Sequence, residues 1–195
     1  MANILSITEG RICFQFDENY WSVYKPDDEN AQDFEKIRNA IQNTKCVDLL
    51  AIYEKADEQS LLLIEFKDFE LVDTNPAEYK TKMIEKYEEL PQKVRDSLSA
   101  ILNSAKNSTH ERDFFQKFVK FFQKEEAKIY VSLLILVDEH FINTNKQIEL
   151  KANELKKKLR SKTEWINASK KDRVLHQSHL PNFASQFEGL TITIT

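Results

Sequence analysis

Two acidic residues and one lysine, on two short apolar segments, are the residues of this chain best suited to do chemistry. Asp48 opens the segment 48–53, and Glu65 and Lys67 end the segment 60–67, with a polar turn between the segments. If both segments are strands, Glu65 and Lys67 share one face. Carboxylates on the core of a sheet are costly unless they are paired or bound. These residue types favour a hard divalent cation, Mg²⁺ or Mn²⁺, that carries a phosphate.

The register of the two segments decides whether these groups meet. We expect a β-hairpin in which Tyr53 lies opposite Ser60. Asp48 then lies directly across from Glu65, with Cβ atoms roughly 4.5–5.5 Å apart. A slip of one residue would place the two acids on opposite faces of the sheet. In the expected register, Asp48, Glu65 and the main-chain carbonyl of Phe66 are the candidate metal ligands.

Lys67 has a role in each of two interpretations. Beside a bound cation, its ammonium would position or activate the attacking water and offset the charge that grows on the phosphate. Without a cation, the same side chains would form a cross-strand salt bridge on a solvated sheet face. The apolar residues Leu61 and Leu63, which alternate with Glu65 on that face, favour burial over exposure.

The Glu-x-Lys spacing carries little information by itself. An acidic residue two positions before a lysine occurs five times in the chain, about as often as chance placement would give in so charged a sequence. Three of the five lie in predicted helices, where residues two apart do not face the same way. Among the five, the pair Glu65 and Lys67 combines a strand with an aspartate on the preceding strand.

The elements around the hairpin predict an α/β fold. Alternation predicts a strand over 12–16, and the β-rich run 20–24 would complete an N-terminal hairpin with it. Further elements are predicted helices over 31–43, 77–89, 91–105, 109–122 and 145–161, a buried strand over 128–137, and short strands near 172–176 and 190–195. We therefore expect one domain over 1–195 with a mixed β-sheet flanked by helices. Tyr130 and Trp165 are expected in its core.

Composition excludes several classes of protein. The chain is 41% apolar and 31% charged, which is ordinary for a soluble globular protein. We see no secretory signal, and no apolar run approaches the roughly 20 residues of a membrane span. Gly10 and Gly189 are the two glycines, so glycine-rich phosphate loops are missing. The cysteine and histidine spacings predict no zinc site. We expect a cytoplasmic protein with two free thiols.

The basic residues are concentrated in one late segment. Residues 1–145 carry 18 Lys and Arg against 27 Asp and Glu, whereas residues 146–173 carry 10 against 4. A basic element on an acidic body could contact a phosphate backbone. The candidate nucleic-acid-binding residues are Lys156, Lys157, Lys158, Arg160 and Lys162. The alternative interpretation is a solvated helix without a ligand.

The sequence Val47-Asp48, a hairpin turn, and Ile64-Glu65-Phe66-Lys67 together resemble the motif of the PD-(D/E)XK nuclease superfamily. The resemblance covers roughly residues 31–137, where a helix precedes the aspartate and helices and a buried strand follow the lysine. Val47 stands where the proline that names the motif would be.

This resemblance implies a restriction-endonuclease-like core of helix, three strands, helix and strand. It implies that Asp48 and Glu65 bind the metal and that Lys67 is the catalytic lysine. Many members also use an acid from the first helix, and here Glu35 is favoured over Asp33 because it lies farther inside that helix.

We therefore expect a metal-dependent nuclease that hydrolyses phosphodiester bonds of nucleic acid, DNA more than RNA, with a possible protein partner or homodimer and no membrane. The alternative is a non-catalytic module on the same fold, serving as an interaction or immunity protein or as a subunit of a bacterial defence complex. A third possibility is an RNA-binding protein that uses the basic helix.

Overall fold

The strands form two sheets in the computed structural model, which describes residues 3–28, 31, 36, 44–69, 76–136, 157–166, 168 and 174–194. Sheet A is antiparallel, in the order β1 (Ile4–Glu9), β2 (Ile12–Asp17) and β8 (Leu190–Ile194). Sheet B has the order β3 (Trp21–Tyr24), β4 (Leu49–Lys55), β5 (Glu58–Asp68), β6 (Lys128–Leu136) and β7 (Val174–His176). In sheet B, β3, β4 and β5 are antiparallel, whereas β5, β6 and β7 are parallel.

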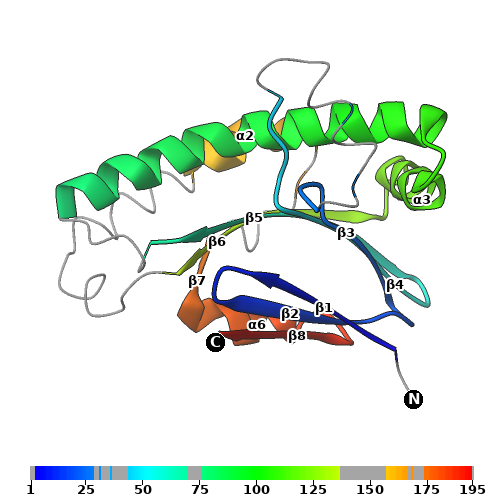
Figure 1. Cartoon of the computed structure of the whole chain (residues 1–195), viewed down its shortest axis with the longest axis horizontal. Coiled ribbons are helices and arrows are strands. Elements are labelled where there is room, and N and C mark those ends of the chain that lie inside the picture. The colour runs from blue at the N-terminus through cyan, green and yellow to red at the C-terminus, as the bar shows by residue number, and fades with distance from the viewer. Residues whose placement is uncertain are drawn as a thin grey trace.

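Three layers result, with sheet B in the middle (Figure 1). The long helix α2 (Pro76–Asn107) and α3 (Arg112–Phe122) lie on one face of sheet B. Sheet A and α6 (Leu180–Ala184) lie on the other face. The predicted α/β class with a mixed sheet is confirmed. However, one face of that sheet is covered mainly by a second sheet.

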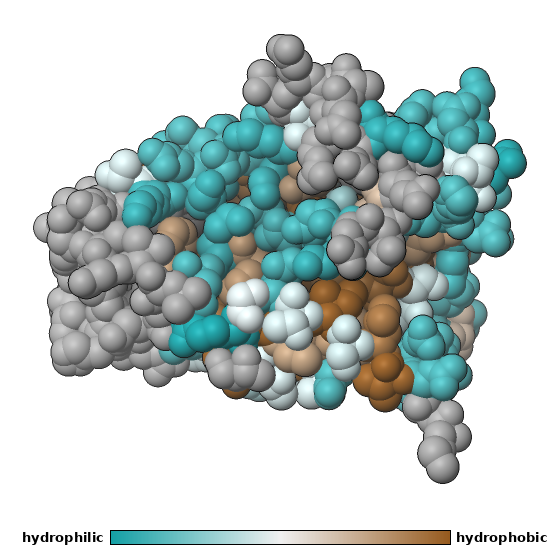
Figure 2. Space-filling view, in the orientation of Figure 1, coloured by the Kyte–Doolittle hydropathy of each residue, from teal (hydrophilic) through white to brown (hydrophobic). Residues whose placement is uncertain are grey.

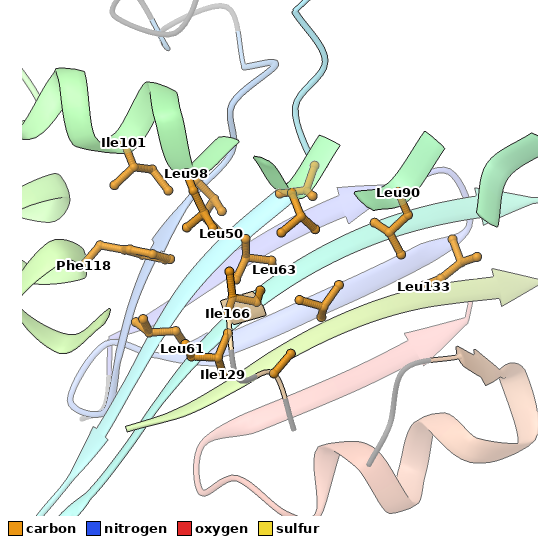
Figure 3. Packing of buried hydrophobic residues seen from close by; sticks show 14 of the residues in the cluster. Leu50, Leu61, Leu63, Leu90, Leu98, Ile101, Phe118, Ile129, Leu133 and Ile166 are labelled. Carbon is orange, nitrogen blue, oxygen red and sulfur yellow. The ribbon is translucent and has the colours of Figure 1, made fainter. Parts of the chain in front are cut away.

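Side-chain alternation in sheet B divides its residues between two apolar cores. Leu50, Leu61 and Leu63 belong to the core under α2 and α3, part of which Figure 3 shows. Their sequence neighbours Ala51 and Leu62 belong to the core that faces sheet A. Both faces of the central strands are therefore buried. The predicted strand over 128–137 is confirmed as β6, which is buried along all but its first residue.

The predicted N-terminal hairpin is wrong in its choice of partner strand. β2 pairs with β1 and β8, whereas Trp21–Tyr24 pairs with β4. The tight turn after β1 depends on Gly10, which has φ +55° and whose added Cβ would lie 2.9 Å from the Phe66 ring. This turn favours β1 as the hairpin partner and leaves β3 to extend sheet B.

The two predicted helices on either side of Pro91 are one continuous helix, α2, so the predicted break is wrong. Proline removes one main-chain N–H and normally kinks or ends a helix. Here Leu90 lies before Pro91, Val94 and Leu98 lie after it, and all three pack in the same core. Burial along both halves of α2 therefore outweighs the local cost of the proline.

The remaining predictions have mixed outcomes. The predicted helix over 109–122 is confirmed as α3, and the short late strands are confirmed as β7 and β8. Residues 157–162 are helical, but 145–156 lie outside the described residues, as does almost all of the predicted helix 31–43. Tyr130 is buried as predicted. The prediction for Trp165 is wrong, because this side chain is 60% exposed.

The most strongly apolar area in the view of Figure 2 lies over the edge strands β1 and β3. A pocket of about 420 Å³ lies there, lined in part by Leu5, Ile7 and Val23. No helix among the described residues is long and apolar enough to cross a membrane.

Candidate functional site

The register predicted for β4 and β5 is confirmed. Tyr53 lies opposite Ser60, and Leu49 lies opposite Ile64. Asp48, the residue before Leu49, therefore stands across from Glu65 at the end of the pairing. Its Oδ2 accepts a hydrogen bond of 2.6 Å from the main-chain N–H of Phe66. Asp48 precedes the first residue of β4, so its side chain extends the hydrogen bonding between the two strands by one residue beyond the main-chain ladder.

Glu65 is the centre of a buried cluster of charges. Its side chain is 1% exposed, and its Oε1 lies 2.8 Å from Lys67 Nζ. Lys93 Nζ, from α2, donates to both carboxylate oxygens of Glu65, at 2.6 and 2.7 Å. Asp48 lies farther from both ammoniums, 3.6 Å from Lys93 and 3.8 Å from Lys67. We call Asp48, Glu65, Lys67 and Lys93 the acid–lysine cluster.

Lys93 is the member of the cluster that sequence reasoning missed. It lies on the inner side of α2, next to Val94, and its side chain is 15% exposed. Ser97, four residues later on the same side, is fully buried. The sequence does carry a signal for Lys93. Lys93 and Ser97 are two polar residues four positions apart on an otherwise apolar helix face, and such a pair predicts that this face of the helix covers polar groups.

Helix α2 also fixes the chain that leads into Asp48. Ser97 Oγ accepts a hydrogen bond of 3.0 Å from the main-chain N–H of Val47. Asp96 Oδ2 accepts one of 3.2 Å from the main-chain N–H of Lys45. The helix that supplies Lys93 therefore also positions the aspartate that Lys93 faces.

The cluster contains two carboxylates and two ammoniums, so its formal charges balance. Burial raises the pKa of Glu65, and the nearby Asp48 carboxylate raises it further, although Lys67 and Lys93 oppose both effects. Burial alone would lower the pKa of Lys67, but the carboxylates of Glu65 and Asp48 outweigh it and the pKa is raised. Lys67 therefore stays charged at neutral pH.

The predicted third acid comes from the helix expected over 31–43. Glu35, and the alternative Asp33, lie outside the described residues. Within the part of the chain that the structure describes, no group of three or more His, Cys, Asp and Glu residues could hold a metal ion. Of the acids predicted to bind a metal, the structure describes Asp48 and Glu65, and both lie near Lys93 Nζ.

The basic candidates lie on the same side of sheet B as the cluster. Lys157, Lys158, Arg160 and Lys162 are exposed on the helical segment 157–162, and Lys156 lies outside the described residues. Leu159, between them in sequence, is buried in the core that α2 covers. In Figure 1 this segment, in gold, is partly hidden behind α2.

No protein-family model, curated protein or solved structure matches this chain. The acid–lysine cluster is therefore the feature on which a function can be based.

Proposed function

We propose that this protein is a metal-dependent nuclease that hydrolyses phosphodiester bonds of nucleic acid, with Asp48, Glu65 and Lys67 at its active site. The observation that carries the proposal is the convergence of both acids on one positive atom. Lys93 Nζ lies 2.6 Å from Glu65 Oε1 and 3.6 Å from Asp48 Oδ1. A point that two carboxylates share with an ammonium is also suited to a metal cation.

The donor atoms fit Mg²⁺ or Mn²⁺. Asp48 and Glu65 offer carboxylate oxygens, the ligands that hard cations prefer. The N–H of Phe66 points toward Asp48, and the N–H and C=O of one strand residue point toward the same neighbouring strand. The Phe66 carbonyl is thus the third ligand that we propose, and water would complete the set. A bound metal would supply an activated water and neutralise charge on the phosphate.

Lys67 supports hydrolysis as a charged group. Because its pKa is raised, the ammonium does not take a proton from water at neutral pH. We assign it the role of holding the phosphate and water in place and of offsetting the negative charge that develops during attack. Its side chain is 26% exposed, so it can reach a substrate that approaches Glu65 from solvent.

The order of elements supports the PD-(D/E)XK type. Strands β3, β4 and β5 are antiparallel neighbours, and α2 and α3 then lead to β6, which is parallel to β5. We propose that β4, β5, α2 and β6 form the restriction-endonuclease-like core. The motif residues then lie where β4 begins and near the end of β5.

One observation favours a second candidate, a non-catalytic interaction or immunity module or a subunit of a defence complex. The acids already have two ammonium partners in the described structure, including Lys93 at hydrogen-bond distance from both oxygens of Glu65. A buried, hydrogen-bonded ion network can serve structure alone. The two candidates differ in whether the acids bind a metal.

The test combines cleavage with direct metal binding. Wild-type protein and Glu65→Gln are incubated with single-stranded and duplex DNA and RNA in Mg²⁺ or Mn²⁺, and Mn²⁺ binding is measured by calorimetry. We expect Glu65→Gln to lower the cleavage rate by at least about 100-fold, as loss of an electrostatic active-site group does, and to weaken Mn²⁺ binding.

Glu89→Gln is the matched control. Glu89 also lies on α2 and pairs with two lysines that are not in the cluster, Lys86 at 2.9 Å and Lys45 at 3.3 Å. Its charge raises the pKa of Lys67 less than the charges of Glu65 and Asp48 do. Glu89→Gln should cleave and bind Mn²⁺ as wild type does. A wild-type protein that neither binds Mn²⁺ nor cuts any of the four substrates would instead support the non-catalytic module.

A further inference from the structure

An exposed tryptophan stands beside the basic segment. The indole of Trp165, in the short helix η1 (Glu164–Ile166), is 60% exposed, whereas the other tryptophan of the chain, Trp21, is 4% exposed. Exposed tryptophans are uncommon, because a large aromatic ring gains free energy when it leaves water. A single exposed apolar side chain is ordinary at a protein surface, so Trp165 indicates a binding site only together with the charged residues that accompany it.

Trp165 stands close in sequence to two of the exposed lysines. Lys158 and Lys162 are four residues apart on the helical segment and so share one side of it, and Trp165 follows three residues later in η1; all three are exposed. The residues that follow each of them in sequence are all buried: Leu159, Thr163 and Ile166.

Hydrogen bonds hold this arrangement in place. Thr163 donates through both its N–H, at 3.0 Å, and its Oγ1, at 2.9 Å, to the carbonyl of Leu159. The N–H of Ile166 donates to the carbonyl of Thr163 at 3.4 Å. The segment is therefore anchored through its buried side, and its exposed side keeps a fixed order of two cations followed by an aromatic ring.

We propose that Lys158, Lys162 and Trp165 form a binding surface for single-stranded nucleic acid. A base stacks on the indole of Trp165, and the ammoniums of Lys158 and Lys162 contact the neighbouring phosphates. This proposal deepens the proposed function, because it names an unpaired strand as the substrate class. It rests on that function for the consequence that the bound strand is cut.

The chemistry of the surface selects this ligand. Cations beside an aromatic ring match a strand that alternates charged phosphates with exposed π faces. A duplex buries its base faces in its own stack, so it can contact the lysines but cannot stack on Trp165. Exposed Glu164 precedes Trp165 in the sequence, and its negative charge on this segment weakens attraction to a simple polyanion. Stacking therefore has to contribute to binding.

The surface formed by Lys158, Lys162 and Trp165 lies on the same side of sheet B as the acid–lysine cluster. Leu159 and Ile166 anchor it in the core between α2 and sheet B, which is the core that contains Leu63 and Leu133. Figure 3 shows Ile166 and Leu63 as members of this core. Glu65 alternates with Leu63 on β5, and both point toward α2. A strand bound at Trp165 thus lies on the side of sheet B that carries the acid–lysine cluster.

Binding is tested without cleavage, on the full chain in EDTA. The affinity for a labelled single-stranded DNA of thymines is measured by fluorescence anisotropy, and quenching of tryptophan emission reports stacking directly. We expect quenching that saturates with binding, because Trp21 is buried and Trp165 is accessible. Trp165→Ala should weaken binding about tenfold, the low end of the effect of stacking one base. Trp165→Phe, which keeps a ring, should lose less.

Salt dependence tests the lysines. For single strands, the slope of log affinity against log salt changes by about 0.7 for each phosphate contact. Lys158→Ala with Lys162→Ala should therefore make the slope shallower by about 1.4. The matched control removes two exposed lysines elsewhere, Lys106 and Lys120 on α2 and α3, and should leave the slope as in wild type.

Three results would overturn this inference: wild-type affinity in Trp165→Ala, equal affinity for a duplex of the same length, or equal affinity for polyphosphate, which has no bases. The inference and the proposed function fail separately. If single strands bind and quench tryptophan emission but none of them is cut in Mg²⁺, the binding surface is supported and the nuclease proposal is contradicted. Cleavage by wild type together with unchanged binding and cleavage in Trp165→Ala would leave the nuclease and remove the surface.

Discussion

Two acids on β5, three residues apart, are neutralised in different ways. Asp68 is 7% exposed on the sheet A side, where the Arg11 guanidinium binds it with two nitrogens, at 2.8 and 3.1 Å. Glu65 is 1% exposed on the α2 side, where two lysine ammoniums contact it, at 2.6 and 2.8 Å. The same strand thus carries a forked arginine pair on one face and a lysine network on the other.

We infer that the difference separates a structural ion pair from a pair of contacts that a metal can replace. A guanidinium matches a carboxylate in a planar geometry with two parallel hydrogen bonds, so this contact is directional and specific. Arg11 lies in the β1–β2 turn, and its pair with Asp68 connects sheet A to sheet B. An ammonium is a compact point charge on a flexible stem. Under the proposed function a divalent cation takes its place, with water filling the coordination positions that the protein leaves open.

The largest expected effect comes from a pair of matched substitutions to the amide. One replaces Asp48 of the acid–lysine cluster, and the other replaces Asp68, which pairs with Arg11. Asp48→Asn should lower cleavage at least about 100-fold, with a small change in stability, since the amide oxygen can still accept from Phe66. Asp68→Asn should leave cleavage per folded molecule within a few-fold of wild type. It should cost about 1–3 kcal/mol of unfolding free energy, because it removes a buried charged hydrogen-bond acceptor.

Two measurements on the same preparations check this prediction: the initial rate of cleavage in Mg²⁺, and the free energy of unfolding from urea titration. The comparison between the two faces of β5 fails if Asp68→Asn loses activity as much as Asp48→Asn does, or if Asp48→Asn is the less stable variant.

A smaller effect is expected from Lys93→Met. Lys93 occupies the point that the two acids share, so we expect it to compete with a metal for them. Its removal should tighten Mn²⁺ binding about tenfold, which corresponds to about 1.4 kcal/mol, a modest value for a like charge a few ångströms away. Without metal the variant should be less stable than wild type, because buried Glu65 loses one partner. Mn²⁺ should then raise its melting temperature more than it raises that of wild type.

Calorimetry with Mn²⁺ and thermal unfolding with and without the ion measure these shifts. Lys86→Met, which removes a lysine of α2 that pairs with Glu89, is the control and should bind Mn²⁺ like wild type. Unchanged or weaker Mn²⁺ binding in Lys93→Met would mean that Lys93 supports the metal site and does not compete for it.

The parts of the fold that sequence predicted are those that depend on local pattern. Alternation and a polar turn were enough for the β4–β5 register, and through it for the meeting of Asp48 with Glu65. The unbroken path of α2 through Pro91 was missed because contacts with sheet B decide it. Lys93 was missed for the same reason, since its partner lies 28 residues away in sequence. Trp165 was assigned to the core by residue type, and neighbouring Ile166 occupies that place.

The smallest expected effect is a difference in pH dependence between two glutamates. Burial and Asp48 raise the pKa of Glu65 above its ordinary value. The folded protein therefore binds a proton there more readily than the unfolded chain does. This contribution to stability is fully present below the unfolded pKa and is lost as pH rises through the folded pKa. Glu89 has the opposite sign, because hydrogen bonding from Lys86 lowers its pKa. Its contribution is present above the unfolded pKa and is lost as pH falls through the folded one.

Urea unfolding in EDTA from acid to neutral pH measures both contributions as differences between wild type and a variant, so that shared titrations cancel. The stability of wild type minus that of Glu65→Gln should decrease as pH rises. The stability of wild type minus that of Glu89→Gln should increase over the same range. If both differences move in the same direction, the environment of Glu65 does not disfavour its charged form. The lysines then hold that carboxylate as firmly as Arg11 holds Asp68, and a metal would have no advantage in replacing them.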